Sequence, residues 1–95
     1  MKVGTITKQS RERRSVSIFY GDDLDEGDEV TEITLCEVDP PGELTATAVL
    51  ATEERSRIWI EDGLEENSPY KITVIVTTNG GEKFEDEIFV NIVEI

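Results

Sequence analysis

The sequence contains no histidine, one cysteine and one tryptophan, and only 6% of its 95 residues are aromatic. Without histidine, the commonest general base and the commonest metal ligand are absent, so Ser-His-Asp and Cys-His catalytic arrangements are excluded. A single cysteine cannot form an intramolecular disulfide bond. No apolar run approaches the ~20 residues that span a membrane, and the N-terminus has no signal-peptide core. We therefore expect neither disulfide stapling nor a membrane partner.

Basic residues are also scarce, and they are unevenly distributed. Twenty-two acidic residues against nine basic ones give a net charge of −13, which argues strongly against nucleic acid as a partner. Residues 1–14 hold five bases and one acid, a charge of +4, whereas residues 15–95 carry −17. Two interpretations stay open. The acids form a solvated surface, or residues 1–14 form a basic strand or arm that docks onto the acidic body of a neighbouring copy or partner.

Short segments rich in valine, isoleucine and threonine alternate apolar with polar residues, and none keeps a helical period for three turns. Seven such segments predict an all-β, immunoglobulin-like or fibronectin-III-like antiparallel β-sandwich in which residues 1–95 form a single domain. A domain this small buries roughly 60% of its unfolded surface, which permits a modest core but no roomy pocket. The expected strands are residues 2–7, 14–20, 29–38, 44–51, 55–61, 69–78 and 83–94.

Turn chemistry separates these segments. Asp39-Pro40-Pro41-Gly42 cannot extend a central strand, because proline lacks the backbone donor, and Asn79-Gly80-Gly81 predicts a hairpin between the last two strands. Between them, Gly63-Leu64 and a polar corner precede Tyr70, which opens an alternating strand. This order is typical of the corner where such a sandwich passes between sheets. We expect the Tyr70 hydroxyl to bond the backbone near residues 64–67.

Alternation also predicts the side chains that face the core. They are Val16, Ile18, Tyr20, Val30, Ile33, Leu35, Ala48, Leu50, Ile58, Ile60, Tyr70, Ile72, Val74, Val76, Ile88, Val90 and Ile92.

Chemical sites are hard to find in this sequence. The acidic loop from Gly21 to Glu29 fails the helix-loop-helix calcium template, because Leu24 and Ile33 fall where carboxylates are required. An irregular calcium site and a solvated loop both remain open. Alternation gives Cys36 the neighbours Glu32, Thr34 and Val38 on the same face of its strand. A nearby carboxylate disfavours the thiolate, so we expect Cys36 to be a small packing residue and not a nucleophile. We assign no catalytic, cofactor or metal residues and expect no enzymatic activity.

Trp59 is the most interesting single residue. If Ile58 and Ile60 point inward, Trp59 points outward beside Arg57, where it either lies flat over a sheet edge or anchors a protein partner. In the opposite register, Trp59 would lie in the core. Other apolar side chains outside the inward set, and the basic segment Lys8 to Arg14, suggest a docking surface. The candidate partner interface consists of Trp59, Phe19, Phe89, Arg11, Arg13 and Arg14.

Two segments in order resemble a family of small bacteriophage proteins described as fibre–tail adaptors or neck-region structural proteins. The first, from Leu24 to Leu35, resembles that family's Leu-x-x-Gly-Asp-x-Ile run and the strand that follows it. The second runs from Ile58-Trp59-Ile60 through the Gly63 corner to the closing hairpin and last strand. The family's glycine-rich corner is replaced here by Glu-Glu-Asn-Ser-Pro.

The resemblance implies an immunoglobulin-like structural component of a phage or prophage particle, in the tail or neck of the virion, made in the host cytoplasm. Its expected partners are other virion proteins and further copies of itself, with no cofactor. The alternative is a cellular immunoglobulin-like binding or adhesion domain, with or without calcium in its acidic loop.

Overall fold

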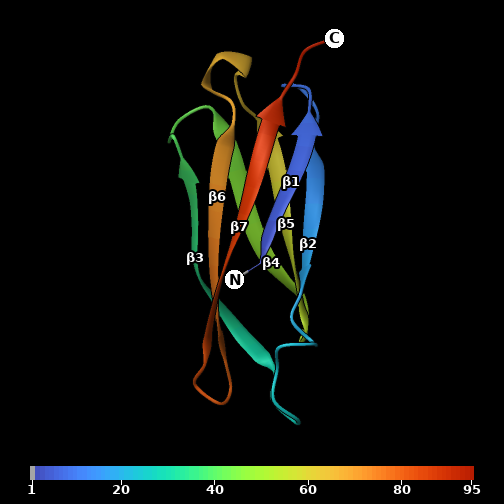
Figure 1. The fold of residues 1–95 in the computed structure, drawn as a ribbon, viewed down its shortest axis with the longest axis vertical. Helices are drawn as coiled ribbons and strands as arrows, with labels where there is room; N and C mark the ends of the chain where they lie inside the picture. The colour runs from blue at the N-terminus through green and yellow to red at the C-terminus, as the bar shows by residue number, and fades with distance from the viewer. Residues whose placement is uncertain (1) are drawn as a thin grey trace.

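The computed structural model describes residues 2–95, which form seven strands and one short helical turn (Figure 1). All seven predicted strands are confirmed, with boundaries within two residues of those expected. They are β1 (Val3–Lys8), β2 (Arg14–Phe19), β3 (Val30–Asp39), β4 (Leu44–Thr52), β5 (Arg55–Asp62), β6 (Tyr70–Thr78) and β7 (Lys83–Ile92).

The strands form two sheets, of order β1-β7-β6-β3 and β2-β5-β4, and β4 and β5 lie behind the larger sheet in Figure 1. Strands β2 to β7 are arranged as in the immunoglobulin constant-type sandwich. The predicted all-β sandwich is therefore confirmed. One pairing differs from the expectation, because β1 runs parallel to β7. Alternation reports which residues share a face but not the direction of the neighbouring strand.

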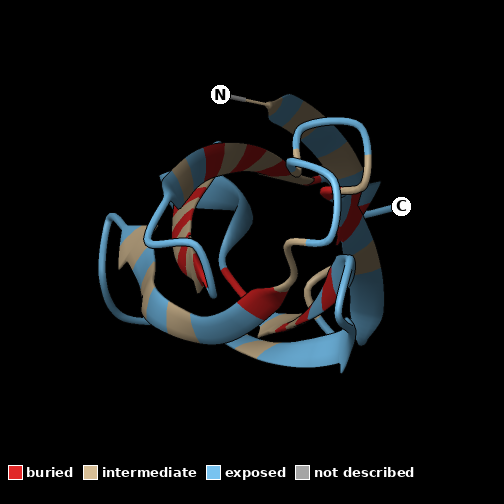
Figure 2. Cartoon of the chain, turned by 90° about the horizontal axis from the view of Figure 1, so that it is seen from below, coloured by how far each residue is buried: buried red, intermediate tan, exposed pale blue. Residues whose placement is uncertain are grey.

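The core lies between the two sheets, and Figure 2 shows buried positions alternating with more exposed ones along the strands. Most of the predicted inward set is confirmed as buried, and Val16, Ile33 and Ala48 pack against the core while partly exposed. The buried members of the predicted set are Ile18, Tyr20, Val30, Ile58, Ile60, Tyr70, Ile72, Val74, Val76, Ile88, Val90 and Ile92.

Two core predictions are wrong. β3 pairs with β6 through two register shifts, so Ile33 faces Val76 while Leu35 faces Ile75 on the outer side. Each extra residue in a bulge reverses which face the following side chains occupy. Consequently Cys36, and not Leu35, packs against the core. Leu50 is the second error, since it is 37% exposed near the end of β4, beside another register shift.

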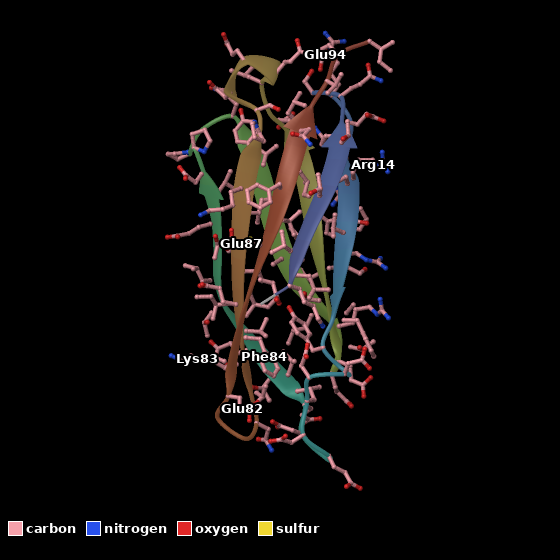
Figure 3. All side chains as sticks on the ribbon, viewed as in Figure 1. Arg14, Glu82, Lys83, Phe84, Glu87 and Glu94 are labelled. Atoms are coloured by element: carbon pink, nitrogen blue, oxygen red, sulfur yellow. The ribbon has the colours of Figure 1, made fainter. Side chains whose placement is uncertain are left out.

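Some core contacts were not predicted. Leu44 is buried at the start of β4, and the Phe84 ring stacks on Tyr20 with centroids 6.1 Å apart. The Tyr20 hydroxyl shares a 2.9 Å hydrogen bond with Ser56 Oγ, which satisfies both buried groups. Figure 3 shows Phe84 inside the lower part of the sandwich. Ser56 was not predicted to be buried because serine is polar. Its alternation with Ile58 and Ile60 could have placed it on the inward side of β5.

The tyrosine corner forms as predicted. The Leu64 N–H donates to the Tyr70 hydroxyl across 3.0 Å, and the short 3₁₀ turn η1 (Glu65–Asn67) lies between these two residues. Gly63 precedes the turn at φ +105°, and a Cβ there would lie 2.8 Å from Leu44 Cδ1, so only glycine fits this position without strain. Within residues 2–95 no helix is long and apolar enough to cross a membrane.

Candidate functional site

The outer face of the β2-β5-β4 sheet is basic and aromatic. On β5, Ile58 and Ile60 are fully buried, and Trp59 points outward as predicted. The pleat places Arg55 and Arg57 on the same side as Trp59, and antiparallel pairing brings Phe19 of β2 opposite Arg55. We call this surface, which consists of Arg13, Phe19, Arg55, Arg57 and Trp59, the arginine–aromatic face.

Stacking holds the arginines of this face in place. The Arg13 guanidinium lies 3.9 Å from the centroid of the Trp59 ring and that of Arg57 5.8 Å from it, while the Arg55 guanidinium lies 5.1 Å from the Phe19 ring. Arg13 Nε also contacts Glu61 Oε1 at 2.6 Å. Cation–π contacts limit the rotamers of long side chains, so this face loses less side-chain entropy on binding than free arginines would.

The structure brings only part of the predicted interface together. Phe19, Trp59 and Arg13 meet on the arginine–aromatic face, whereas Arg11 is exposed in the turn between β1 and β2. Arg14 begins β2 and is exposed, on the right-hand side of the molecule in Figure 3. Phe89 is separate from these residues, since it lies half-buried on β7, on the outer side of the other sheet.

Sequence reasoning left Arg55 and Arg57 out of the predicted interface. Arg57 could have been included from its alternation with Ile58 and Ile60, which gives it the same face as Trp59. The same alternation gives Arg55 this face, but its contact with Phe19 could not be predicted, because that contact depends on the pairing register of β2 and β5.

The basic N-terminal segment, residues 1–14, has fewer exposed bases for binding a neighbour than the sequence predicted. β1 is a strand of the larger sheet, and Lys8 at its end is buried. The Lys8 ammonium donates to the carbonyl oxygens of Asp62 (2.6 Å) and Ser10 (3.2 Å). Burial lowers the pKa of Lys8, and the nearby Asp62 charge partly opposes this shift. The prediction that Lys8 approaches a neighbour is therefore wrong; in residues 8–14 the arginines are the exposed bases.

Lys2 is also bound within the chain. Its ammonium lies 2.9 Å from Asp23 Oδ2 and donates to the carbonyl oxygen of Phe19, while its backbone N–H donates to Asp86 Oδ1 across 2.7 Å. Asp86 is buried on β7, and its Oδ2 has no hydrogen-bond partner among residues 2–95. These contacts border an open groove of about 330 Å³ between β1 and β2, and they hold the start of β1 against β7.

The outer side of the β1-β7-β6-β3 sheet has the opposite chemistry. Half-buried Leu35, Ile75 and Phe89 lie there among carboxylates, and Lys71 forms the single ion pair described on this side, 3.9 Å from Glu87. We call this surface the acidic face. Its carboxylates are Glu32, Glu37, Asp39, Glu85 and Glu87.

The acidic loop gathers at one end of the sandwich with the β6–β7 hairpin, at the bottom of Figure 1. Asp28 caps this end, since its Oδ1 accepts the N–H groups of Glu29 and Gly80, both at 2.9 Å. The Thr78 hydroxyl, followed by these two N–H groups, lowers the pKa of Asp28. Repulsion from Asp25 raises the pKa of Glu82. In residues 2–95, no group of three or more candidate ligand side chains is placed to hold a metal ion.

Cys36 occupies a packed position. Its Sγ lies 3.8 Å from the carbonyl oxygen of Ala46, and burial raises the pKa of its thiol. The expected neighbours were partly wrong, since the bulge leaves Glu32 and Thr34 exposed while Val38 shares the core side with Cys36. A thiol with a raised pKa is a poor nucleophile at neutral pH.

The sequence was compared with models of known protein families. Residues 8–91 match the family described as "Podophage GP4 fiber-tail adaptor protein gp77". The matched range covers the first segment on which the sequence resemblance depended and the second as far as residue 91, so the suspected fibre–tail adaptor family is confirmed. No curated protein sequence gives a significant match.

Proposed function

The chain belongs to the podophage GP4 fiber-tail adaptor protein gp77 family, and on this premise we propose that it joins fibre to tail in a phage or prophage particle, without catalysis. The family is one of structural phage proteins of the virion tail. The match over residues 8–91 is the observation that carries the proposal, because it covers nearly all of the folded sandwich.

The surfaces of the sandwich support contacts with proteins. An adaptor must hold two neighbours at once, and this domain has two broad faces of different chemistry on opposite sheets. Tryptophan and arginine are enriched at interface hot spots, and the Trp59 ring contacts two guanidinium groups on one of these faces. A net charge of −13 repels phosphate backbones, so the proposed partners are virion proteins and further copies of the chain, not nucleic acid or membrane.

The proposed role also implies where the protein is found before the particle assembles. A protein that joins the particle from inside the bacterium is made in the host cytoplasm, where a domain with its one cysteine packed in the sandwich needs no oxidising compartment. The family assignment supports a particle component over a cellular adhesion domain with a calcium-binding loop.

Deleting the gene from the phage or prophage that encodes the chain tests the adaptor role. We expect particles that carry tails but lack fibres, as seen by electron microscopy and by mass spectrometry of purified particles. Wild-type chain supplied in trans should restore the fibres, whereas Trp59→Ala should restore fewer. Glu66→Ala, an exposed change at the corner between β5 and β6, is the matched control and should restore them fully. Fibre content that is unchanged by the deletion would rule out the role.

A further inference from the structure

The two kinds of base are segregated between the two sheets. Every arginine lies in the β2-β5-β4 sheet or in the turn that leads to it, and every lysine lies in or next to the other sheet. Arginine is enriched at protein interfaces while lysine is depleted there. The arginines are Arg11, Arg13, Arg14, Arg55 and Arg57, and the lysines are Lys2, Lys8, Lys71 and Lys83.

The arginine–aromatic face has more positive charge than its own residues neutralise. Glu61 is paired with Arg13, and no carboxylate of residues 2–95 lies within ion-pair distance of Arg55 or Arg57. Phe19 and Val49 on the same side are 38% and 44% exposed. In a molecule of net charge −13, this face is suited to a surface that offers carboxylates around apolar side chains.

The chain itself has such a surface. On the acidic face, Leu35 of β3 lies opposite Ile75 of β6, and Glu85 of β7 lies opposite Ile75 on its other side. Phe89 lies four residues further along β7, opposite Lys71. Carboxylates lie to either side along the same strands. Figure 3 shows one of them, Glu87, on the sheet nearer the viewer, with Arg14 at the edge formed by β2.

We propose that the arginine–aromatic face of one copy binds the acidic face of the next copy, so that copies of the chain stack sheet to sheet. This deepens the proposed role as an assembly component by naming a partner and the surface it uses. The two faces lie on opposite sheets, so the contact is heterologous and one copy can hold two neighbours. The molecule measures 45 × 19 × 17 Å, and a face of 45 by 19 Å is close to the ~800 Å² that each partner buries in a standard interface.

Charge sets the direction of the contact. A symmetric dimer through either face would bring like charges together, which costs several kcal/mol when they are juxtaposed. Two copies of net charge −13 repel each other at long range, and pairing the arginine–aromatic face with the acidic face is the arrangement that opposes this repulsion. The one tryptophan lies inside the proposed contact and reports on it.

Sedimentation velocity over a concentration series, together with Trp59 emission, tests the stacking on the full chain. Arg57→Glu reverses a charge on the arginine–aromatic face. Lys83→Glu makes the same change in net charge, from −13 to −15, but on the acidic face, where it adds a carboxylate on the same side of β7 as Glu85. Glu85→Lys reverses a charge on the acidic face. All three side chains are exposed, and circular dichroism and thermal melting verify that each variant is folded.

We expect the wild type to self-associate, with a blue shift of Trp59 emission as concentration rises. Arg57→Glu and Glu85→Lys should each weaken association about tenfold or more, because each puts like charges in contact. Lys83→Glu should retain it. Mixing Arg57→Glu with Glu85→Lys should recover association, since the unaltered arginine–aromatic face of Glu85→Lys then meets the unaltered acidic face of Arg57→Glu.

Three results would overturn the stacking. They are a monomeric wild type at every concentration, association that Arg57→Glu leaves intact, and a mixture that recovers nothing. Equal loss in Lys83→Glu and Arg57→Glu would assign the effect to net charge and contradict the named faces. These outcomes are separate from the adaptor role. A monomeric chain that is still required for fibre attachment contradicts the stacking alone, and a stacking chain that particles do not need contradicts the adaptor role alone.

Discussion

Single side chains at the two ends of the sandwich account for much of its local order. At the upper end in Figure 1, the Tyr70 hydroxyl satisfies the Leu64 N–H, and Gly63 allows the chain to turn closely over Leu44. At the lower end, Asp28 holds the hairpin through the Gly80 N–H. The order of residues in the sequence predicts the contact between Tyr70 and Leu64. It does not predict the hydrogen bond between Asp28 and Gly80, because no local pattern relates residues so far apart in the chain.

Removal of the Tyr70 hydroxyl should destabilise the domain. Tyr70→Phe leaves the ring in place but deprives the Leu64 N–H of its acceptor, so we expect a loss of about 1–2 kcal/mol in the free energy of unfolding. Urea denaturation measures this as a lower midpoint with an unchanged slope. A midpoint equal to that of the wild type would show that the hydroxyl contributes nothing.

Glu82 should reduce stability at neutral pH. Repulsion from Asp25 raises its pKa in the folded protein. The folded state therefore holds this proton more tightly than the unfolded state. The favourable contribution is complete below the unfolded pKa of 4.5 and is lost as pH rises through the folded pKa. Glu82→Gln should thus raise the melting temperature at pH 7, by an amount that shrinks as pH falls below about 4.5.

Glu43→Gln is the control for this change, because Glu43 is exposed next to β4, at the other end of the molecule. It should leave the melting temperature within the scatter of repeated scans. A gain for Glu82→Gln that is the same at pH 4 and pH 7, or no gain at all, would refute the repulsion from Asp25.

At the scale of elements, the sequence was a good guide to strands and a poor one to their pairing. Val, Ile and Thr alternation with proline and glycine breaks located all seven strands, because those signals are local. The parallel β1–β7 pair and the two register shifts in β3 depend on distant partners, so no local pattern contains them. The same limit explains the interface residues. Trp59 followed from alternation, but its separation from Phe89 followed only from the sheet order.

The bulges in β3 give a test at this scale. Ile33 packs against the core, whereas Leu35, two residues further along, lies outside it opposite Ile75. Ile33→Thr should cost about 1–2 kcal/mol of unfolding free energy through lost apolar burial. Leu35→Thr should change it by about 0.5 kcal/mol or less, as an outer-face substitution does.

Denaturation at low protein concentration, where copies do not associate, gives both values. Uninterrupted alternation would make the two positions equivalent, since they would share one face. Equal losses at Ile33 and Leu35 would therefore contradict the observed register.

At the scale of the whole molecule, charge is the dominant feature. The net charge of −13 is spread over a slender body, and the acids of the loop from Gly21 to Glu29 gather with Glu82 at one end. Such a surface opposes the folded state of an isolated copy through self-repulsion. The same charge favours neighbours that present arginine, which the arginine–aromatic face supplies.

Added salt should therefore stabilise the isolated domain. Raising sodium chloride to about 0.1 M screens charges more than ~10 Å apart, which relieves repulsion among the carboxylates, and the melting temperature should rise. Calcium should raise it no more than magnesium does at matched ionic strength. A calcium-specific shift at micromolar concentration would instead indicate a site in the acidic loop.

The central claim is that this immunoglobulin-like sandwich works in the virion as an adaptor, through the face that carries Trp59. Electron cryomicroscopy of intact particles measures this directly. The account predicts copies of the chain at the junction of fibre and tail, with the Trp59 ring covered by a neighbouring protein. Particles whose junction is formed without this chain, or copies there whose arginine–aromatic face is open to solvent, would contradict it.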